Sequence, residues 1–178
     1  YDASSNSVIG GSTNGAGNVV SDNSGGGIIA DGNATTIIGN LIGTSADGLS
    51  VIGNTEVGIK SGGNDVVIGG DSASERNVVA GTIVGGNFNG SGIVLISFGG
   101  GFSGGVVQGN YIGTNINGVV GGGFGNGGFG VFIVGDYSNA LIGGSASGVG
   151  NKIVSSGMVG VAATGFNAFP PSGIYPTN

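Results

Sequence analysis

The stretch DVVIGGDSASER, residues 65–76, holds the one local group of charged side chains in the chain: Asp65, Asp71, Glu75 and Arg76. Carboxylates beside a cation can serve in general acid–base catalysis. The chain has no histidine, however, so its many serines lack a base that would activate them as nucleophiles. We interpret the group as a solvated turn whose acid–arginine pair contributes less than about 1 kcal/mol, and we expect no enzyme, no catalytic residue and no cofactor.

The same stretch approaches a calcium-binding motif. Residues 62–71, GGNDVVIGGD, partly match the nonapeptide G-G-x-G-x-D-x-U-x, which makes Asp65 and Asp71 candidate calcium ligands. Calcium rolls repeat this motif in consecutive turns because neighbouring turns share each ion. Here the motif occurs once, so we assign no metal site and keep Asp65 and Asp71 as the residues to inspect.

The elements that must position these residues are short strands. The 178 residues include 46 glycines, and the apolar residues are mainly Val, Ile and Ala in short runs. No window of a dozen residues lacks glycine, and each Gly inside a helix costs about 1 kcal/mol relative to Ala. The composition therefore predicts an all-β fold, with a single domain over residues 1–165 and an extended tail with proline and aromatic residues over 166–178.

The charge pattern limits the partners. The net charge is −6, and the three cations, Lys60, Arg76 and Lys152, are isolated from one another. Phosphate binding needs clustered Lys and Arg, so we expect no nucleic-acid partner. No apolar run approaches the ~18 residues of a membrane helix, so we expect no membrane insertion. The chain begins at Tyr1 rather than Met, which suggests a processed or excised form of an extracellular or cell-surface protein.

Short apolar phrases recur along the chain and alternate between two forms. One form is SVIGG at residues 7–11, VVIGG at 66–70 and ALIGG at 140–144. The other form, IIGNLIGT at 37–44 and VVQGNYIGT at 106–114, falls between them. The order is therefore ABABA, which is the self-similarity expected of a repeat protein.

A strand that begins with glycine closes each unit. Its first apolar residue is Ile28, Ile59, Ile93, Val131 or Val161, at intervals of 31, 34, 38 and 30 residues. A unit this short cannot bury an apolar face alone and must stack on its neighbours. We therefore predict a parallel β-helix, a solenoid of about five coils with about 30 residues per coil and neighbouring strands about 4.8 Å apart.

Asparagine recurs at matched positions, beside glycine at the ends of apolar runs. We predict that these side chains bond from coil to coil as structural ladders, at turns where φ becomes positive. A role in binding sugars is the alternative. The residues form three sets: Asn18, Asn77 and Asn151; Asn40 and Asn110; Asn33, Asn64 and Asn139.

The alternation of xIGG…GNVVS…GGGIIADGN with TIIGNLIGTSADG…GIKSGGN resembles the right-handed parallel β-helix repeat proteins of the pectate-lyase-like group, over residues 6–165. The resemblance implies the coiled fold and a secreted or surface-attached bacterial protein. Members that cleave polysaccharides need dense charge, so the sparse charge here implies the non-catalytic type. The third unit departs from the pattern at residues 97–105, SFGGGFSGG, where we expect a longer loop.

Alternation along the closing strands predicts an apolar patch. In units three and four the outward residues are Val94, Ile96, Phe132 and Val134. Soluble proteins seldom leave such a patch bare, so we expect a contact surface between subunits. The alternative is a cover formed by the 97–105 loop or by the tail. The tail offers four apolar side chains as further contact candidates: Phe166, Phe169, Ile174 and Tyr175.

Two functions fit these expectations. Open coil ends, guarded at one end only by Asp2, invite addition of further strands. The first hypothesis is therefore a non-catalytic extracellular structural protein that assembles as a homo-oligomer through its coil ends and tail, into a filament or a surface layer. The second is a carbohydrate-binding or polysaccharide-degrading β-helix module of a larger surface protein, with Tyr111, Tyr137 or Phe124 as platforms on which a glycan stacks.

Overall fold

Short parallel strands make up the regular structure. The computed structural model describes residues 4–165, and within this range the chain forms fifteen strands and no helix. The strands are β1 (Val8–Gly10), β2 (Val19–Val20), β3 (Ile28–Ala30), β4 (Thr36–Ile38), β5 (Leu41–Ile42), β6 (Val57–Ser61), β7 (Val67–Gly69), β8 (Val78–Val79), β9 (Ser91–Ser97), β10 (Val106–Gln108), β11 (Tyr111–Ile112), β12 (Val131–Gly135), β13 (Leu141–Ile142), β14 (Lys152–Ile153) and β15 (Val161–Thr164). The all-β prediction is confirmed.

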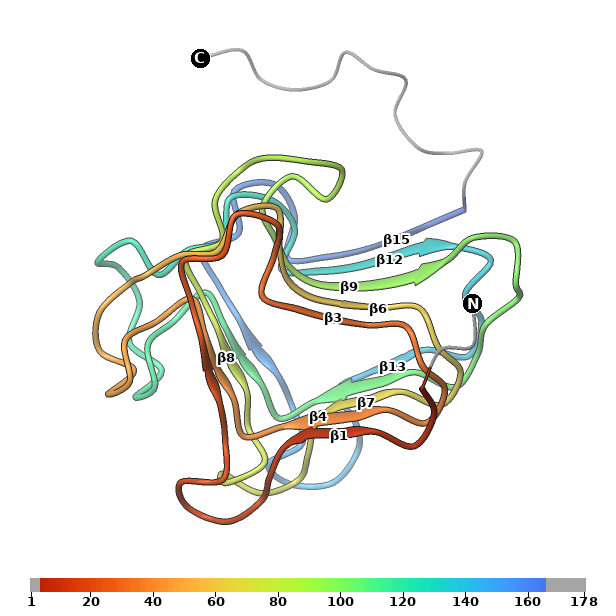
Figure 1. The fold of residues 1–178 in the computed structure, drawn as a ribbon, viewed down its shortest axis with the longest axis horizontal. Coiled ribbons are helices and arrows are strands. Elements are labelled where there is room, and N and C mark those ends of the chain that lie inside the picture. Colours follow the sequence, from red (N-terminus) through yellow and green to blue (C-terminus); the bar gives the residue numbers. More distant parts are fainter. Residues whose placement is uncertain (1–3, 166–178) are drawn as a thin grey trace.

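The strands wind into a solenoid with three sides (Figure 1). The first sheet has the order β1-β4-β7-β10-β13, the second β2-β5-β8-β11-β14 and the third β3-β6-β9-β12-β15. Each turn of the chain adds one strand to each sheet, so coil one is β1 to β3 and coil five is β13 to β15. All strand pairs are parallel, which confirms the predicted β-solenoid.

The residues predicted to be equivalent in successive units are paired in the structure. In the third sheet Ile28 pairs with Ile59, Ile59 with Ile93, Ile93 with Val131, and Val131 with Val161. The two alternating phrases both begin in the first sheet, where they form β1, β4, β7, β10 and β13, and the second form continues into β5 or β11 of the second sheet. They therefore occupy equivalent places in successive coils, and the alternation distinguishes odd coils (one, three and five) from even coils (two and four).

Apolar columns fill the space between the three sheets. Every strand sends at least one residue inward, and the longer strands of the third sheet send two, as β9 does with Ile93 and Leu95. These side chains stack along the axis of the solenoid. Burying one such Ile or Val contributes about 1.5–3 kcal/mol. The central members, all with 0% exposure, are Ile37, Ile68 and Val107 from the first sheet, Ile42, Val79 and Ile112 from the second, and Ile59, Ile93 and Val131 from the third.

One asparagine ladder runs the length of the first corner, where the first sheet turns into the second. Each Asn donates from its backbone N–H and its Nδ2 to Oδ1 of the next Asn, at 2.9–3.2 Å. The side chains also donate to main-chain carbonyls, as Asn77 does to Ile37 O at 2.7 Å. The ladder unites two of the predicted sets, in the order Asn18, Asn40, Asn77, Asn110 and Asn151.

The predicted positive φ is wrong for this ladder. In the even coils the left-handed residue is the preceding glycine, Gly39 (φ 73°) or Gly109 (φ 67°). The asparagine keeps a strand-like backbone because it already belongs to the ladder of main-chain bonds, as when Asn18 O accepts from Leu41 N at 2.8 Å. In the third predicted set Asn139 does have a positive φ of 53°.

A second ladder at the second corner, between the second and third sheets, is interrupted. Asn23 donates to Oδ1 of Asn54 at 2.9 Å, and the backbone N–H of Thr82 donates to Oδ1 of Asn126 at 3.1 Å. Thr82 stands where an asparagine would join the two pairs. Its buried Oγ1 has no hydrogen-bond partner among the described residues, and neither does Oγ of Ser156 at the next step.

The loops alternate between these two corners (Figure 1). At the first corner, eight residues separate the inward residue from the asparagine in odd coils (10–17, 69–76 and 143–150) and two in even coils (38–39 and 108–109). At the second corner the long loops belong to the even coils, as residues 43–53 and 113–125. Each coil therefore has one long and one compact corner, and neighbouring coils reverse the assignment.

Removing an inner step of the first ladder should destabilise the fold. Asn77→Ala removes the acceptor of the Asn40 N–H and Nδ2 groups, and it removes the Nδ2 bonds to Ile37 O and Asn110 Oδ1. Four bonds are lost in a buried corner, so we expect a loss of about 3 kcal/mol in urea unfolding followed by circular dichroism. Asn18→Ala at the end of the ladder breaks bonds on one side only and should cost about 1 kcal/mol. Equal losses for the two variants would contradict the ladder's role.

Completing the second ladder should stabilise the fold. Thr82→Asn places an amide where its Oδ1 can accept from Asn54 and its Nδ2 can donate to Asn126, in a site where the present Oγ1 is unpaired. We expect a gain of about 1 kcal/mol in the free energy of unfolding. Thr82→Val, which removes the hydroxyl without adding an amide, is the control for packing alone. A Thr82→Asn variant no more stable than Thr82→Val would show that the gap is not a missing ladder step.

Candidate functional site

The outer face of the second sheet carries a row of apolar side chains. The register aligns Val19, Leu41, Val78, Tyr111 and Lys152, while the residue after each of them points into the core. Alternation along a strand places this row outside. The row is apolar for four of its five positions and ends on a lysine.

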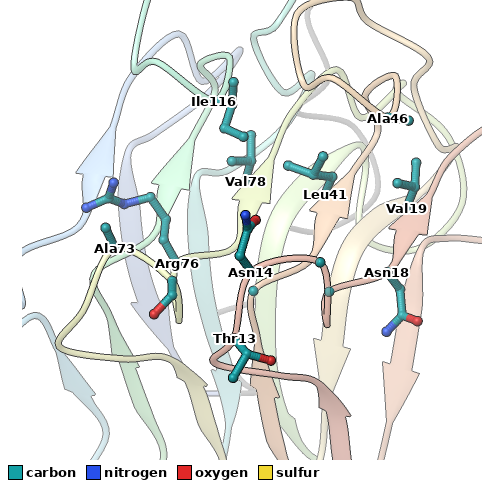
Figure 2. A pocket seen from close by; sticks show the side chains of 14 residues that line it. Thr13, Asn14, Asn18, Val19, Leu41, Ala46, Ala73, Arg76, Val78 and Ile116 are labelled. Atoms are coloured by element: carbon teal, nitrogen blue, oxygen red, sulfur yellow. The ribbon is translucent and has the colours of Figure 1, made fainter.

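The long loops of both corners turn this face into a groove. Thr13, Asn14, Ser74 and Arg76 come from first-corner loops of odd coils, and Ala46 and Ile116 come from second-corner loops of even coils. The cavity between them has a volume of about 510 Å³. Figure 2 shows Val19, Leu41 and Val78 on its floor, with Thr13 and Asn14 to one side and Ile116 to the other.

Arg76 is the one charged side chain among these lining residues, and its guanidinium is held in place. Its Cζ lies 3.9 Å from the centre of the Tyr111 ring, a cation–π contact. Its Nε donates to Gly109 O at 3.0 Å. Among residues 4–165 the one ion pair is Lys60–Asp31, at 2.8 Å. The predicted acid–arginine pair is therefore replaced by a stack on an aromatic ring.

The neighbouring carboxylates brace the loops. Oε2 of Glu75 accepts from the backbone N–H of Asp71 and from both the N–H and the Oγ of Ser72. These bonds, that from the Ser72 hydroxyl foremost, lower the pKa of Glu75. Asp47 in the loop of coil two accepts from Ser45 Oγ and Leu49 N, which likewise lowers its pKa. Both groups stay charged and shape the groove walls.

The two calcium candidates do not come together. Asp65 and Asp71 lie beyond opposite ends of β7, whose three residues alone span about 10 Å. Asp65 (φ 53°) fills a left-handed position at the third corner, between the third and first sheets. The other coils fill it with Asn6, Ala34, Gly104 and Asn139. Among the described residues no three His, Cys, Asp or Glu side chains gather in a cluster that could hold a metal.

The predicted apolar patch forms, but the chain itself buries it. Val94 pairs with Phe132 and Ile96 with Val134 on the outer face of the third sheet, and the four side chains are 0–4% exposed. Phe88 and Phe129 pack against them, and the Phe129 ring stacks on Phe132 with centroids 4.3 Å apart. The four residues thus form a second small core instead of a free surface, and their contact with another subunit stays a prediction.

Phe88 was not predicted as a cover of the patch. The signal available was the extra length before β9, GGNFNG at residues 85–90, which puts an aromatic residue in a loop beside the patch. The covers predicted instead were the 97–105 loop and the tail. Phe166, Phe169, Ile174 and Tyr175 lie outside the described residues, as does the predicted tail 166–178.

The predicted stacking platforms are largely occupied. Phe124 is buried, and the Tyr137 ring packs against the main core while its Oη donates to Gly63 O at 2.8 Å. Tyr111 is half-buried, and Arg76 lies over its ring. A glycan stacked on these rings therefore finds no fully open face.

The two ends of the solenoid expose apolar side chains. Val161 in β15 is 46% exposed, whereas Val131, its register partner in β12, is 0% exposed. At the other end the core residues Ile9 and Val20 are only partly buried, and the outward residues Val8 in β1 and Ile29 in β3 are 65% and 56% exposed. The end strands β1, β2 and β3, and likewise β13, β14 and β15, have a strand neighbour on one side only among the described residues.

In comparisons with known proteins, no family model, no curated protein and no solved structure matches the chain. Between residues 4 and 165 no helix has the length and apolar character needed to cross a membrane.

Stability should depend on pH through Tyr137. Burial, with a smaller contribution from the Asp65 charge, raises the pKa of Tyr137 from 10.0 to about 12. Because the folded state favours the neutral phenol, its contribution is complete below pH 10 and is lost as the pH rises through about 12. Urea unfolding between pH 8 and pH 12 measures this loss. Tyr137→Phe should lower stability at pH 8 by about 1 kcal/mol and flatten the alkaline decline, whereas an unchanged decline would rule out Tyr137 as its source.

Proposed function

We propose that the protein is a non-catalytic structural protein, extracellular or on the cell surface, which assembles through its coil ends into a filament or surface layer. The tail at residues 166–178 is the second element of this assembly. Membership of the non-catalytic, right-handed type of the pectate-lyase-like group belongs to the same proposal. The protein acts mechanically, as a rigid unit added to others along one axis.

The observation that carries the proposal is the pair of open ends. A parallel end strand presents unpaired N–H and C=O groups that can pair with another strand. At both ends the apolar columns also stop while their side chains are incompletely covered: Val161 is 46% exposed at one end, and Ile9 and Val20 are only partly buried at the other. A further coil continues the main-chain bonds and the columns at once, so the same contacts that hold the coils together inside the protein hold the added coil.

The internal construction supports a mechanical role. The first ladder joins all five coils through side-chain amides, which are buried in coils two to four, and every coil adds a strand to each of the three sheets. Carboxylates and cations, which polysaccharide-cleaving enzymes of this fold use in catalysis, have structural contacts here. Glu75 accepts hydrogen bonds within its loop, and Arg76 stacks on Tyr111.

The alternative proposal is a carbohydrate-binding or polysaccharide-degrading module of a larger surface protein. The groove of the second sheet favours it, since an apolar floor beside Thr13, Asn14 and Arg76 can hold a sugar chain that bears an anionic group. It would predict a dispersed monomer that binds an acidic glycan, with binding lost in Arg76→Ala.

Electron microscopy and sedimentation velocity at neutral pH, over a series of protein concentrations, test the first proposal. We expect end-to-end rows that lengthen as concentration rises. Val161→Lys and Ile29→Lys place a charge on the end strands β15 and β3, at opposite ends of the solenoid, and should shorten the rows. The control is Val84→Lys, a similarly exposed site on coil three, 57% exposed, which should assemble like the wild type. Monomers at every concentration, or equal effects of all three substitutions, would refute assembly through the ends.

A further inference from the structure

Both ends of the solenoid carry an odd coil. Coils one and five each have a long first corner, at residues 10–17 and 143–150, and a compact second corner. Inside the protein an odd coil touches only even coils, whose long and compact corners are reversed. The two ends therefore offer a surface of the same kind.

The first corner has no room for long loops on neighbouring coils. Gly39, at the compact corner of coil two, lies between the loops of coils one and three. A Cβ atom on it would lie 2.3 Å from Gly11 O and 2.9 Å from Ser74 O, and its N–H donates to Glu75 O at 3.0 Å. Gly109 repeats the arrangement in coil four, where its N–H donates to Val149 O at 2.8 Å.

The second corner follows the same rule, but here the even coils carry the long loops and the odd coils are compact. Gly81, at the compact corner of coil three, donates from its N–H to Phe124 O at 2.9 Å, and a Cβ atom on it would lie 2.4 Å from Val51 Cγ1. The even loops meet across this corner, since Ile116 N donates to Gly48 O at 3.1 Å. Each long loop thus fills the space over a neighbouring compact corner.

Stacking two identical copies head to tail breaks this rule twice. Coil five of one copy would meet coil one of the next, which places loops 143–150 and 10–17 at the same corner only about 4.8 Å apart. The second corners at that junction would both be compact, so no loop would cover either of them. Poor packing of this kind weakens an interface without abolishing its main-chain bonds.

We infer that each end of the solenoid is shaped to receive a coil of the even kind, and that loops 10–17 and 143–150 limit the stacking of identical copies. The inference rests on the proposed assembly through coil ends. The partner it specifies is a β coil with a two-residue first corner that ends in asparagine. Such an asparagine extends the ladder, because its Nδ2 can donate to Asn18 Oδ1 at one end, or its Oδ1 can accept from Asn151 at the other.

The test converts one end to the even kind in the full chain. Replacing residues 143–150 by Ile-Gly, the sequence of positions 38–39, gives coil five a compact first corner. A second variant, with a copy of residues 33–61 inserted after Gly165, ends the solenoid on an even coil without shortening a loop. The control makes the same replacement at residues 69–76, inside the solenoid. Circular dichroism verifies folding, and sedimentation velocity gives the concentration at which rows form.

We expect both end variants to form rows at a concentration at least about ten-fold below that of the wild type, equivalent to about 1.4 kcal/mol per junction, and the control to show no gain. Wild-type rows that form as readily as those of the end variants would overturn the inference and leave assembly through the ends standing. Folded variants that stay monomeric at every concentration would overturn both.

Discussion

Successive coils lie one strand spacing apart, about 4.8 Å, and the architecture follows from what fits within that distance. Main-chain bonds and apolar columns repeat at this spacing without difficulty. The asparagine amides of the first corner do so as well, because each bonds the next through Oδ1 and Nδ2. An eight-residue loop does not, since it is wider than one strand. Long loops therefore occur on every second coil at a given corner, and glycines such as Gly39 lie beneath them.

This packing constraint also explains the groove over the second sheet. Odd coils send their loops out along one side of the sheet and even coils along the other, so the outward row of Val19, Leu41 and Val78 lies between two walls. The walls are stiffened locally, by Glu75 in one loop and by Asp47 in another. The groove is thus a consequence of loop alternation, and the charged residues near it hold its shape.

The third sheet shows a different solution for an apolar outer face. Its strands β9 and β12 place Val94, Ile96, Phe132 and Val134 together, and exposing them all would forgo several kcal/mol of burial. Coil three carries extra residues before β9, and Phe88 from that segment packs on the face together with Phe129. A solenoid can thus acquire a second core on its outside when one coil lengthens.

The sequence by itself determined the solenoid, its parallel sheets and its register, because alternation along a strand and the recurring Gly and Asn positions are local signals that repeat in every unit. The intervals from Ile28 to Val161 required nothing beyond counting. Tertiary structure alone decided that the sets of Asn18 and Asn40 form one ladder, that Arg76 stacks on Tyr111, that Asp65 and Asp71 stand apart, and that Phe88 covers the patch. These outcomes depend on which loops and side chains meet across coils some thirty residues apart in the chain, and the spacing of residues along one strand carries no information about such meetings.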